Sequence, residues 1–221
     1  MSDDRTIRRY AEVKEAGLDD WRWLVGGLHA RFATGDFATG IALADAIAAA
    51  AEEADHHPDL DLRYPFLAVK LVSHDVGGVT DRDLRLARRI SELAAAQGVP
   101  AAPDRISTLE LGLDTADRDA VLPFWRALLG FDDSRSFPGR EILDRDGRLP
   151  TVWTQETDAH DTPRQRWHLD VIVPIEQAQA RIDAALAAGG TMVSDEEAPA
   201  FWVLADAEGN RACVCTPEGR G

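Results

Sequence analysis

Cysteine is nearly absent from this chain. Only Cys213 and Cys215 occur among its 221 residues. They stand two apart in a predicted strand, so both side chains point to one face and are poorly placed to bond each other. We therefore expect two free thiols, which fits a reducing compartment.

The chain also lacks any long hydrophobic run. No apolar stretch approaches the roughly 18 residues needed to span a bilayer. The N-terminal residues 1–15 are polar, with no hydrophobic segment followed by a small-residue cleavage site, which argues against secretion. We expect a soluble, cytoplasmic protein with no membrane partner.

Basic residues are scarce relative to acidic ones. The 24 Lys and Arg residues stand against 39 Asp and Glu residues, giving a formal net charge of −15. Such a charge repels nucleic-acid phosphates and anionic membrane surfaces. The sequence therefore disfavours nucleic-acid binding, and a small molecule is the expected partner.

The length of the chain favours two domains, because single domains most often have about 100–150 residues. Residues 98–105 are short and rich in Pro and Ala, as expected of a semi-rigid connector. We therefore predict a first domain over residues 1–97, a linker over 98–105 and a second domain over 106–221.

The first half alternates predicted strands and helices. A strand is expected at 25–33, and Asp36 then offers an N-cap oxygen to a helix whose apolar residues recur at three and four. Pro58 favours a turn after the adjacent histidines. A second strand is expected at 66–74. Thr80 and Asp83 form a predicted capping box for a helix that ends at Gly98.

The second half contains a weak internal repeat. A strand at 108–113 precedes a helix from Asp117 to Leu129, and a strand at 168–173 precedes a helix that starts near Pro174 and stops at Gly189. Further strand candidates follow each helix, with turns at 146–147 and 208–210. The pattern predicts two βαβββ modules.

Three histidines come together at a predicted helix end and a predicted strand end. Imidazole has an unperturbed pKa of about 6.5, so it can give and take a proton near neutrality. The pattern, with the intervals between its members, is Glu52, three residues, His56-His57-Pro58, five residues, Tyr64, nine residues, His74, eight residues, Asp83. It resembles the signature of the pterin-4a-carbinolamine dehydratase family at every element, and the likeness extends over nearly all of residues 20–97.

This resemblance implies a hydro-lyase of tetrahydrobiopterin metabolism that removes water from 4a-hydroxytetrahydropterin and gives quinonoid dihydropterin, without a metal or other cofactor. The implied catalytic residues are His56, His57 and His74. Of these, we expect His56 and His74 to transfer protons, in an order that the sequence leaves open. The implied pterin contacts are those of His57, together with Asp55, Ser73 and Asp75. Ser73 stands where the family usually has Thr, which keeps a hydroxyl.

Other interpretations apply to the remaining members of the pattern. Asp83 is explained by helix capping alone, Glu52 can be a solvated helix residue, and Tyr64 can be a core aromatic with a wet hydroxyl. We leave these three out of the predicted catalytic set. Zinc binding by the histidines is disfavoured, because adjacent histidines rarely point at one tetrahedral centre.

The sequence from 106 to 217 resembles the glyoxalase-like (vicinal oxygen chelate) family. The likeness rests on three segments, DTADRDAVLPFWRALLGF, WHLDVIVP and LADAEGNRACVC. That family commonly builds a metal site from His and Glu on its first, fourth, fifth and eighth strands. The matching positions here are expected to be Thr108 or Ser107, Gln155, His168 and Arg211. Only His168 is a usual ligand, and Arg would repel a cation.

A typical metal site is therefore not expected in the second half. His168 is predicted to bond Asp170 or the main chain. Aromatic residues on the strands are more simply core than cleft-lining; they are Trp153, Trp167, Phe201 and Trp202.

The predicted fold class is α+β. It combines a pterin-dehydratase-like antiparallel sheet, with helices on one face, and a glyoxalase-like pair of βαβββ modules. The leading hypothesis is a dehydratase with an accessory second domain. Two alternatives are a non-catalytic pterin-binding or oligomerisation protein and a metal-dependent enzyme of the second domain. Both resemblances imply a homo-oligomer.

Overall fold

The structure is a computed structural model, and it describes residues 4–159, 167–205 and 211–218. The chain divides into two compact units, residues 1–106 and 107–220, and each is described by itself. Every helix in the described part of the chain is too short or too polar to cross a lipid bilayer.

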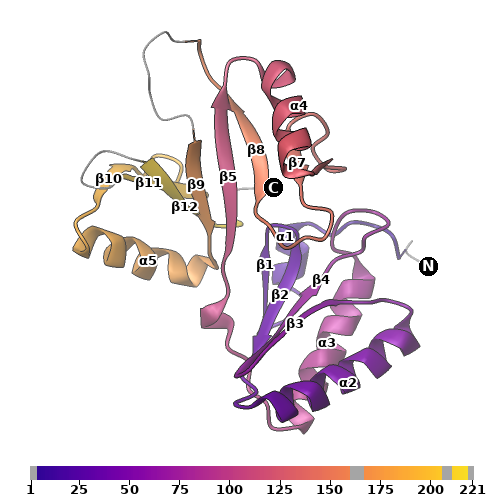
Figure 1. Ribbon diagram of the computed structural model, residues 1–221. Coiled ribbons are helices and arrows are strands. Elements are labelled where there is room, and N and C mark those ends of the chain that lie inside the picture. Colours follow the sequence, from indigo (N-terminus) through magenta and orange to yellow (C-terminus); the bar gives the residue numbers. More distant parts are fainter. Residues whose placement is uncertain (1–3, 160–166, 206–210, 219–221) are drawn as a thin grey trace. The chain divides into compact units, whose positions relative to one another are not determined.

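The first unit is an antiparallel sheet of order β1-β2-β4-β3 with helices on one face (Figure 1). Its elements are α1 (Tyr10–Lys14), β1 (Trp21–Leu24), β2 (Gly27–Phe32), α2 (Phe37–Ala54), β3 (Asp59–Arg63), β4 (Phe66–Leu71), α3 (Asp81–Ala96) and a 3-10 turn, η1 (Pro103–Arg105). The sheet face made by Leu67, Val69 and Leu71 packs against α2 and α3.

The helix boundaries of the first unit follow the predicted caps. The side chain of Asp36 accepts a hydrogen bond from the backbone N–H of Thr39, and Thr80 with Asp83 completes the capping box of α3. The strands differ in detail. The predicted strand at 25–33 begins only at Gly27, and β1 and β3 were not anticipated.

The segment expected to be a linker is attached to the first unit. Val99 lies in its hydrophobic core, and the backbone of Ala101 makes a bridge with Phe32. The N–H of Ala33 donates to Pro100, and the N–H of Ala102 donates to Arg31. Residues 100–102 are thus joined to the end of β2 by backbone hydrogen bonds and one isolated bridge.

The second unit contains the two predicted βαβββ modules. The first comprises β5 (Thr108–Thr115), α4 (Arg118–Leu129), β6 (Asp132–Asp133), β7 (Glu141–Leu143) and β8 (Thr151–Glu156). The second comprises β9 (Trp167–Ile172), α5 (Ile175–Ala187), β10 (Thr191–Ser194), β11 (Phe201–Ala205) and β12 (Arg211–Cys215). Among the described residues they form one eight-stranded sheet of order β10-β11-β12-β9-β5-β8-β7-β6.

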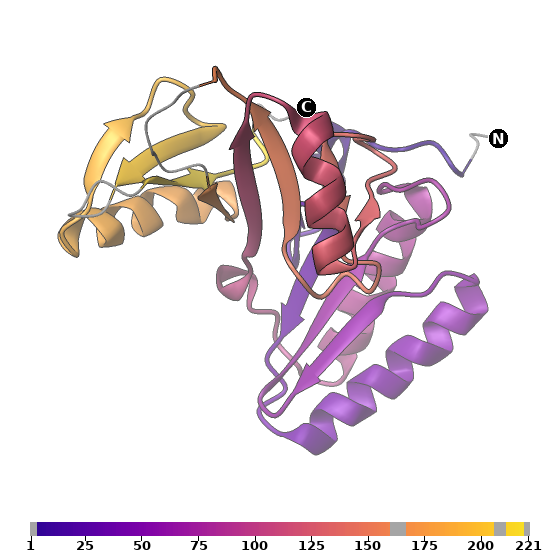
Figure 2. The same ribbon diagram turned by 45° about the horizontal axis from the view of Figure 1, so that its top comes forward.

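One face of this sheet is covered by helices. Figure 2 shows α4 beside β5 and β8, and α5 beside β12 and its neighbours. Trp167 packs edge-on against Trp125 of α4, with 4.9 Å between ring centroids, and Trp202 packs into the core under α5. Because strand residues alternate between faces, His168, Asp170 and Trp153 point to the other face.

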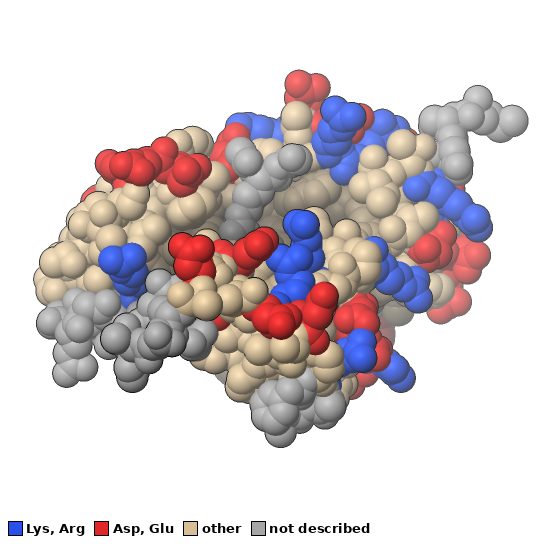
Figure 3. All heavy atoms as spheres, turned by 90° about the horizontal axis from the view of Figure 1, so that it is seen from above, with Lys and Arg blue, Asp and Glu red and all other residues tan. Residues whose placement is uncertain are grey.

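Pro174 is the N-cap of α5 rather than its first helical residue. The turn expected at 208–210 lies outside the described residues. Figure 3 shows acidic and basic side chains intermingled on the face that it presents, so the negative net charge is not gathered there into a single acidic field.

Candidate functional site

The end of helix α2 turns His56 into the protein. Asp55 adopts a left-handed conformation with φ 48°, which Asp tolerates better than most residues. The N–H of His56 then donates to the carbonyl of Ala51 at 3.1 Å. His56 is consequently only 7% exposed, although it follows an exposed helix end.

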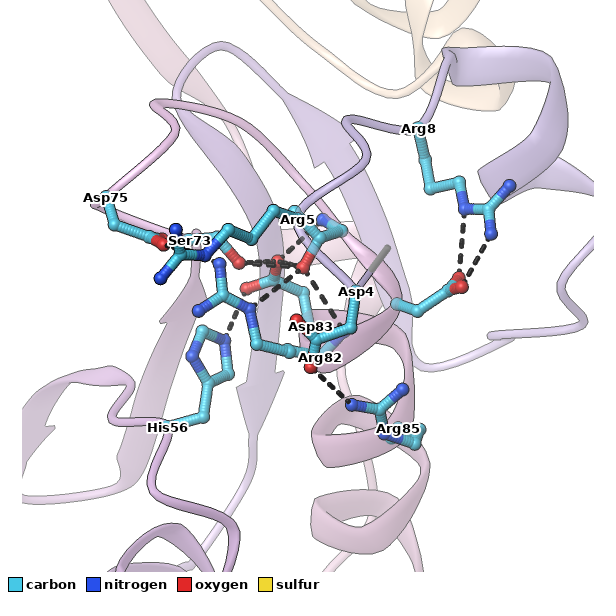
Figure 4. Close-up of polar contacts among 11 residues, drawn as sticks. Asp4, Arg5, Arg8, His56, Ser73, Asp75, Arg82, Asp83 and Arg85 are labelled. Carbon is cyan, nitrogen blue, oxygen red and sulfur yellow. Dashed lines mark hydrogen bonds and ion pairs between the residues drawn. The ribbon is translucent and has the colours of Figure 1, made fainter. Parts of the chain in front are cut away.

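Asp83 meets His56 at the start of helix α3. Its Oδ1 lies 2.8 Å from Nε2 of His56, and its Oδ2 accepts from the N–H of Thr80 at 2.7 Å. The hydroxyl of Ser73 donates to the same Oδ2 at 2.7 Å. Asp83 is fully buried, so one carboxylate caps a helix and joins the ends of α2 and β4 (Figure 4).

These contacts determine the charge of Asp83. Burial raises the pKa of this carboxyl, but the hydrogen bonds from His56, the Thr80 backbone and Ser73 outweigh burial and hold it below its ordinary value. An ionised carboxylate can only accept hydrogen bonds. Nε2 of His56 must therefore carry a proton, which leaves Nδ1 of the neutral ring as the nitrogen with a free lone pair.

The loop after β4 carries the other predicted residues. The backbone of Ser73 bridges to Gly78, and this turn exposes His74 and Asp75. The Asp75 carboxylate lies 2.6 Å from Nη2 of Arg82 and 3.6 Å from Nε of Arg5 (Figure 4). The hydrogen bond from Arg82 holds the pKa of Asp75 below its usual value.

The N-terminal segment secures this loop from the other side. The N–H of Arg8 donates to Val79 at 2.7 Å, and its guanidinium forms an ion pair with Asp81 at 2.5 Å. Ile7 packs so closely on Gly78 that a Cβ there would lie 2.9 Å from its side chain. The loop that presents His74 is thus held by contacts from two directions.

The structure brings His56, Ser73 and Asp83 into one network and leaves His57 at its edge. Nε2 of His57 lies 3.1 Å from Oε1 of Glu52, and both side chains are exposed. Glu52 is an exposed residue of α2, in agreement with the interpretation of it as a solvated helix residue, and its side chain makes this surface contact with His57. The interpretation of Tyr64 as a core aromatic is wrong, because it stands in the turn between β3 and β4 and is 68% exposed.

Asp83 is the member of this network that the sequence-based prediction left out of the catalytic set. Helix capping explained it fully, and the capping is present, but one carboxylate has enough lone pairs to cap the helix and bind His56 as well. Its place in the spacing pattern was the available signal. Ser73 was expected to touch substrate; that contact stays a prediction, because its buried hydroxyl already bonds Asp83.

The second unit holds a separate polar group on the open face of its sheet. Nε2 of His168 lies 3.5 Å from Oδ1 of Asp170, and Nδ1 lies 3.5 Å from Oδ1 of Asp114. Cys213 of β12, rather than Arg211, is the residue beside His168 and Asp170. The sequence analysis placed the eighth-strand position two residues too early. Cys213 and Cys215 are both free thiols, as predicted.

Two further carboxyl groups lie near this face, that of buried Glu110 and that of half-buried Glu141. Glu110 of β5 pairs across the sheet with Asp170, and Glu141 of β7 pairs with Trp153. Burial, and then the negative charge of Glu110, raise the pKa of Glu141 to about 7. Acidic side chains are therefore concentrated where the fold removes them from water.

Comparison with known proteins gives one family match for each of the two compact units. The family model for pterin 4 alpha carbinolamine dehydratase matches residues 4–93, and the model for a glyoxalase-like domain matches residues 110–215. Several curated proteins with the printed name "Putative pterin-4-alpha-carbinolamine dehydratase" match the first unit. The one from Metallosphaera sedula is 43% identical over 84 residues, which is 37% of this chain and 88% of that protein. The one from Aquifex aeolicus is 40% identical over 84 residues, which is 37% of this chain and 85% of that protein.

Two solved structures resemble the separate units. A transcriptional coactivator/pterin dehydratase from Brucella melitensis has 31% sequence identity and a TM-score of 0.39, covering 40% of this chain and 99% of its own. A glyoxalase/bleomycin resistance protein/dioxygenase superfamily member from Vibrio splendidus has 16% sequence identity and a TM-score of 0.34. The match covers 50% of this chain and 99% of that one. On the sequence matches, the chain belongs to the pterin 4 alpha carbinolamine dehydratase family through its first unit, and its second unit matches the model for a glyoxalase-like domain.

Proposed function

We propose that the first unit dehydrates 4a-hydroxytetrahydropterin to quinonoid dihydropterin by histidine acid–base catalysis. Membership of the family supports this activity in general. The observation that carries the proposal for this chain is the buried contact of 2.8 Å between His56 and Asp83, because it prepares one imidazole for proton transfer at a defined nitrogen.

The reaction needs a proton delivered and a proton removed. Protonation of the 4a-hydroxyl lets it leave as water, and loss of the N5 proton supplies the electron pair for the new double bond between N5 and C4a. Each positioned general catalyst contributes about 10²–10⁴-fold. One catalyst is His56, acting through Nδ1, and the other is His74 on the loop after β4.

His56 and Asp83 form a pair in which the carboxylate orients the ring. Ionised Asp83 favours the Nε2–H tautomer, and it also stabilises the imidazolium form when Nδ1 takes a proton. Ser73 and Thr80 keep Asp83 in place through hydrogen bonds to Oδ2. Asp83 thus acts as a positioning residue.

The pterin ring requires contacts as well as proton transfer. Exposed His57 and Asp55 at the end of α2, and Asp75 in the loop after β4, are the proposed contacts. The amide and amino groups of a pterin offer donors and acceptors that imidazole and carboxylate groups can pair. The glyoxalase-like unit is an accessory in this proposal, and the chain is a homo-oligomeric cytoplasmic enzyme.

The test measures dehydration of 4a-hydroxytetrahydropterin by the full-length protein after chelator treatment. Wild-type protein should accelerate the reaction, while His56→Gln and His74→Gln should each lower kcat by about 10²-fold or more. Tyr64→Phe, which changes an exposed ring on the same unit, serves as the control and should retain the wild-type rate.

Absence of any acceleration by folded wild-type protein would refute a catalytic role. In that case tight pterin binding, measured by calorimetry, would support the non-catalytic binding alternative. Activity that disappeared on chelation and returned with a metal would transfer the chemistry to metal-dependent catalysis.

A further inference from the structure

Arg8 stands outside the spacing pattern that carries the family resemblance, yet it contacts the helix start at which that pattern ends. Its backbone N–H donates to the carbonyl of Val79 at 2.7 Å. Its guanidinium binds both carboxylate oxygens of Asp81, with Nε 2.9 Å from Oδ1 and Nη2 2.5 Å from Oδ2 (Figure 4). One residue of the N-terminal segment therefore holds the chain on both sides of Thr80.

Thr80 links this contact to the proposed catalytic pair, and it is fully buried. Its N–H donates to Oδ2 of Asp83 at 2.7 Å, and its hydroxyl lies 2.8 Å from that of Ser73. The other carboxylate oxygen of Asp83 lies 2.8 Å from Nε2 of His56. A continuous series of contacts thus leads from Arg8 through Thr80 and Asp83 to the imidazole.

The side chain of Arg8 is itself held in place. Its Nη1 donates to Oε1 of Glu12 at 3.1 Å, so the guanidinium lies between one carboxylate of α1 and one of α3. The side chains of Arg8 and Asp81 are only 25% and 28% exposed, and salt screens a partly buried pair less than an exposed one. The hydrogen bonds between them raise the pKa of Arg8 and lower the pKa of Asp81. Both groups are therefore charged near neutral pH.

This arrangement requires arginine in particular. Two nitrogens of a guanidinium form a planar fork that matches the two oxygens of a carboxylate, whereas lysine offers a single rotating ammonium group. The preceding residue, Ile7, packs so closely on Gly78 that a Cβ there would lie 2.9 Å from its side chain. The N-terminal segment therefore follows the loop before α3 closely, with the fork of Arg8 at its end.

We propose that Arg8 is a positioning residue for the His56–Asp83 pair. This inference rests on the proposed dehydratase function and extends it to a residue outside the family signature. Because Arg8 fixes the chain on both sides of Thr80, the N–H of Thr80 stays aimed at the Asp83 carboxylate. The carboxylate then keeps its distance and direction to His56. A misplacement of about 1 Å far from the reacting atoms can cost about 10²-fold in rate.

Steady-state kinetics of the full-length Arg8→Gln variant tests this role. The backbone contact to Val79 remains in the variant, so we expect a partial misplacement that lowers kcat by about 3–10-fold and leaves KM nearly unchanged. Arg8→Lys keeps the charge without the fork and should recover only part of the loss. Arg9→Gln is the matched control, because it removes an exposed arginine from the next position, and it should keep the wild-type kcat.

A double-mutant cycle separates positioning from a general effect on stability. If Arg8 acts through Asp83, Arg8→Gln should lower kcat far less in the Asp83→Asn background than in wild type, because the pair that it positions is already lost. Losses that simply multiply would show that Arg8 acts by another route. Circular dichroism verifies folding of each variant. If Arg8→Gln does not fold, Arg8→Lys takes its place in the cycle.

Proton NMR gives a readout that needs no turnover. The Nε2–H of His56, donated to a buried carboxylate at 2.8 Å, should give a downfield resonance that exchanges slowly with water and disappears in His56→Gln. Arg8→Gln should broaden this resonance and speed its exchange with water, because the carboxylate is held less firmly. Arg9→Gln should leave the resonance as it is in wild type.

Three results would overturn the role of Arg8. They are a wild-type kcat in folded Arg8→Gln, multiplicative losses in the cycle, and a His56 resonance that Arg8→Gln leaves unchanged. A wild-type protein without dehydratase activity would instead refute the proposed function. The resonance would then decide by itself whether Arg8 holds the His56–Asp83 pair.

Discussion

The two units treat buried acidic groups in opposite ways. In the first, Asp83 is surrounded by donors and its pKa is held below the ordinary value. In the second, half-buried Glu141 lies near the buried carboxylate of Glu110, and the pKa of Glu141 is raised to about 7. The comparison shows that burial alone does not determine the charge of a carboxyl group. The supply of hydrogen-bond donors decides whether it is an anion prepared to orient a histidine or a group that holds its proton.

The same contrast separates the two histidine environments. His56 makes one short contact of 2.8 Å to a fully hydrogen-bonded carboxylate. His168 lies between two carboxylates at 3.5 Å. A short, charge-assisted hydrogen bond suits proton transfer at the opposite nitrogen, whereas a contact of 3.5 Å is too long for a strong hydrogen bond. The predictions below test this distinction.

The largest expected effect comes from Asp83→Asn. An amide can donate to Nε2 of His56 and so favour the wrong tautomer, as in catalytic triads where the same change costs about 10⁴-fold. We expect kcat for pterin dehydration to fall by about 10²–10⁴-fold in steady-state assays. Asp81→Asn changes the neighbouring helix start without touching His56 and should cost far less; equal losses in both variants would contradict the role given to Asp83.

The next effect concerns the packing of His168. Gly112→Ala places a methyl group within 2.3–2.9 Å of three ring atoms, so the ring or the strand must move. Overpacking of this kind typically costs about 1–3 kcal/mol. Chemical denaturation should show that loss in the second unit, with dehydration kinetics unchanged. Gly139→Ala is not a neutral comparison because Gly139 has φ 70°; Ala185→Gly on α5 serves better as a mild destabilising reference.

A smaller effect is expected for Arg82→Gln. This change removes the ion pair of 2.6 Å that holds Asp75, while the remaining contact from Arg5 is longer. The loop carrying His74 should become less ordered. We expect a rise of about 1.5–5-fold in KM with a smaller change in kcat, since an exposed pair contributes about 0.2–1 kcal/mol. Arg89→Gln on the outer face of α3 is the control. High salt should reduce the difference between wild type and Arg82→Gln.

The last expected effect is a pH dependence of stability. Because the pKa of Glu141 is about 7 in the folded state and 4.5 ordinarily, its protonation favours folding. This contribution is complete below pH 4.5 and is lost as the pH rises through about 7. The melting temperature of wild type relative to Glu141→Gln should therefore fall between pH 5 and 8. The pH dependence expected from Asp83 has the opposite sign, because the pKa of this carboxyl is lowered. Its contribution to stability is present above about pH 3.8 and is lost in stronger acid. A pH-independent difference at Glu141 would contradict the raised pKa.

Local signals located most of the helices. Asp36 and Thr80 cap α2 and α3 as their spacing predicted, and Asp117 caps α4. Such caps depend on hydrogen bonds within three residues, so they are visible in sequence. Strands were harder. The sequence did not predict β1 and β3, which are the two edge strands of the first sheet. Short edge strands gain their stability from a neighbouring strand rather than from their own sequence. Asp59–Arg63, with its alternating charges, is an example.

The sequence by itself determined the family signature, the α+β class and the two βαβββ modules, because spacing, capping and hydrophobic period are local properties. Only the tertiary structure decided that Asp83 reaches from a helix cap to His56, since the two residues are 27 positions apart. It also decided that Cys213 rather than Arg211 stands beside His168 and Asp170. Both residues share one face of β12, and only the pairing register between β9 and β12 selects which of them faces Asp170.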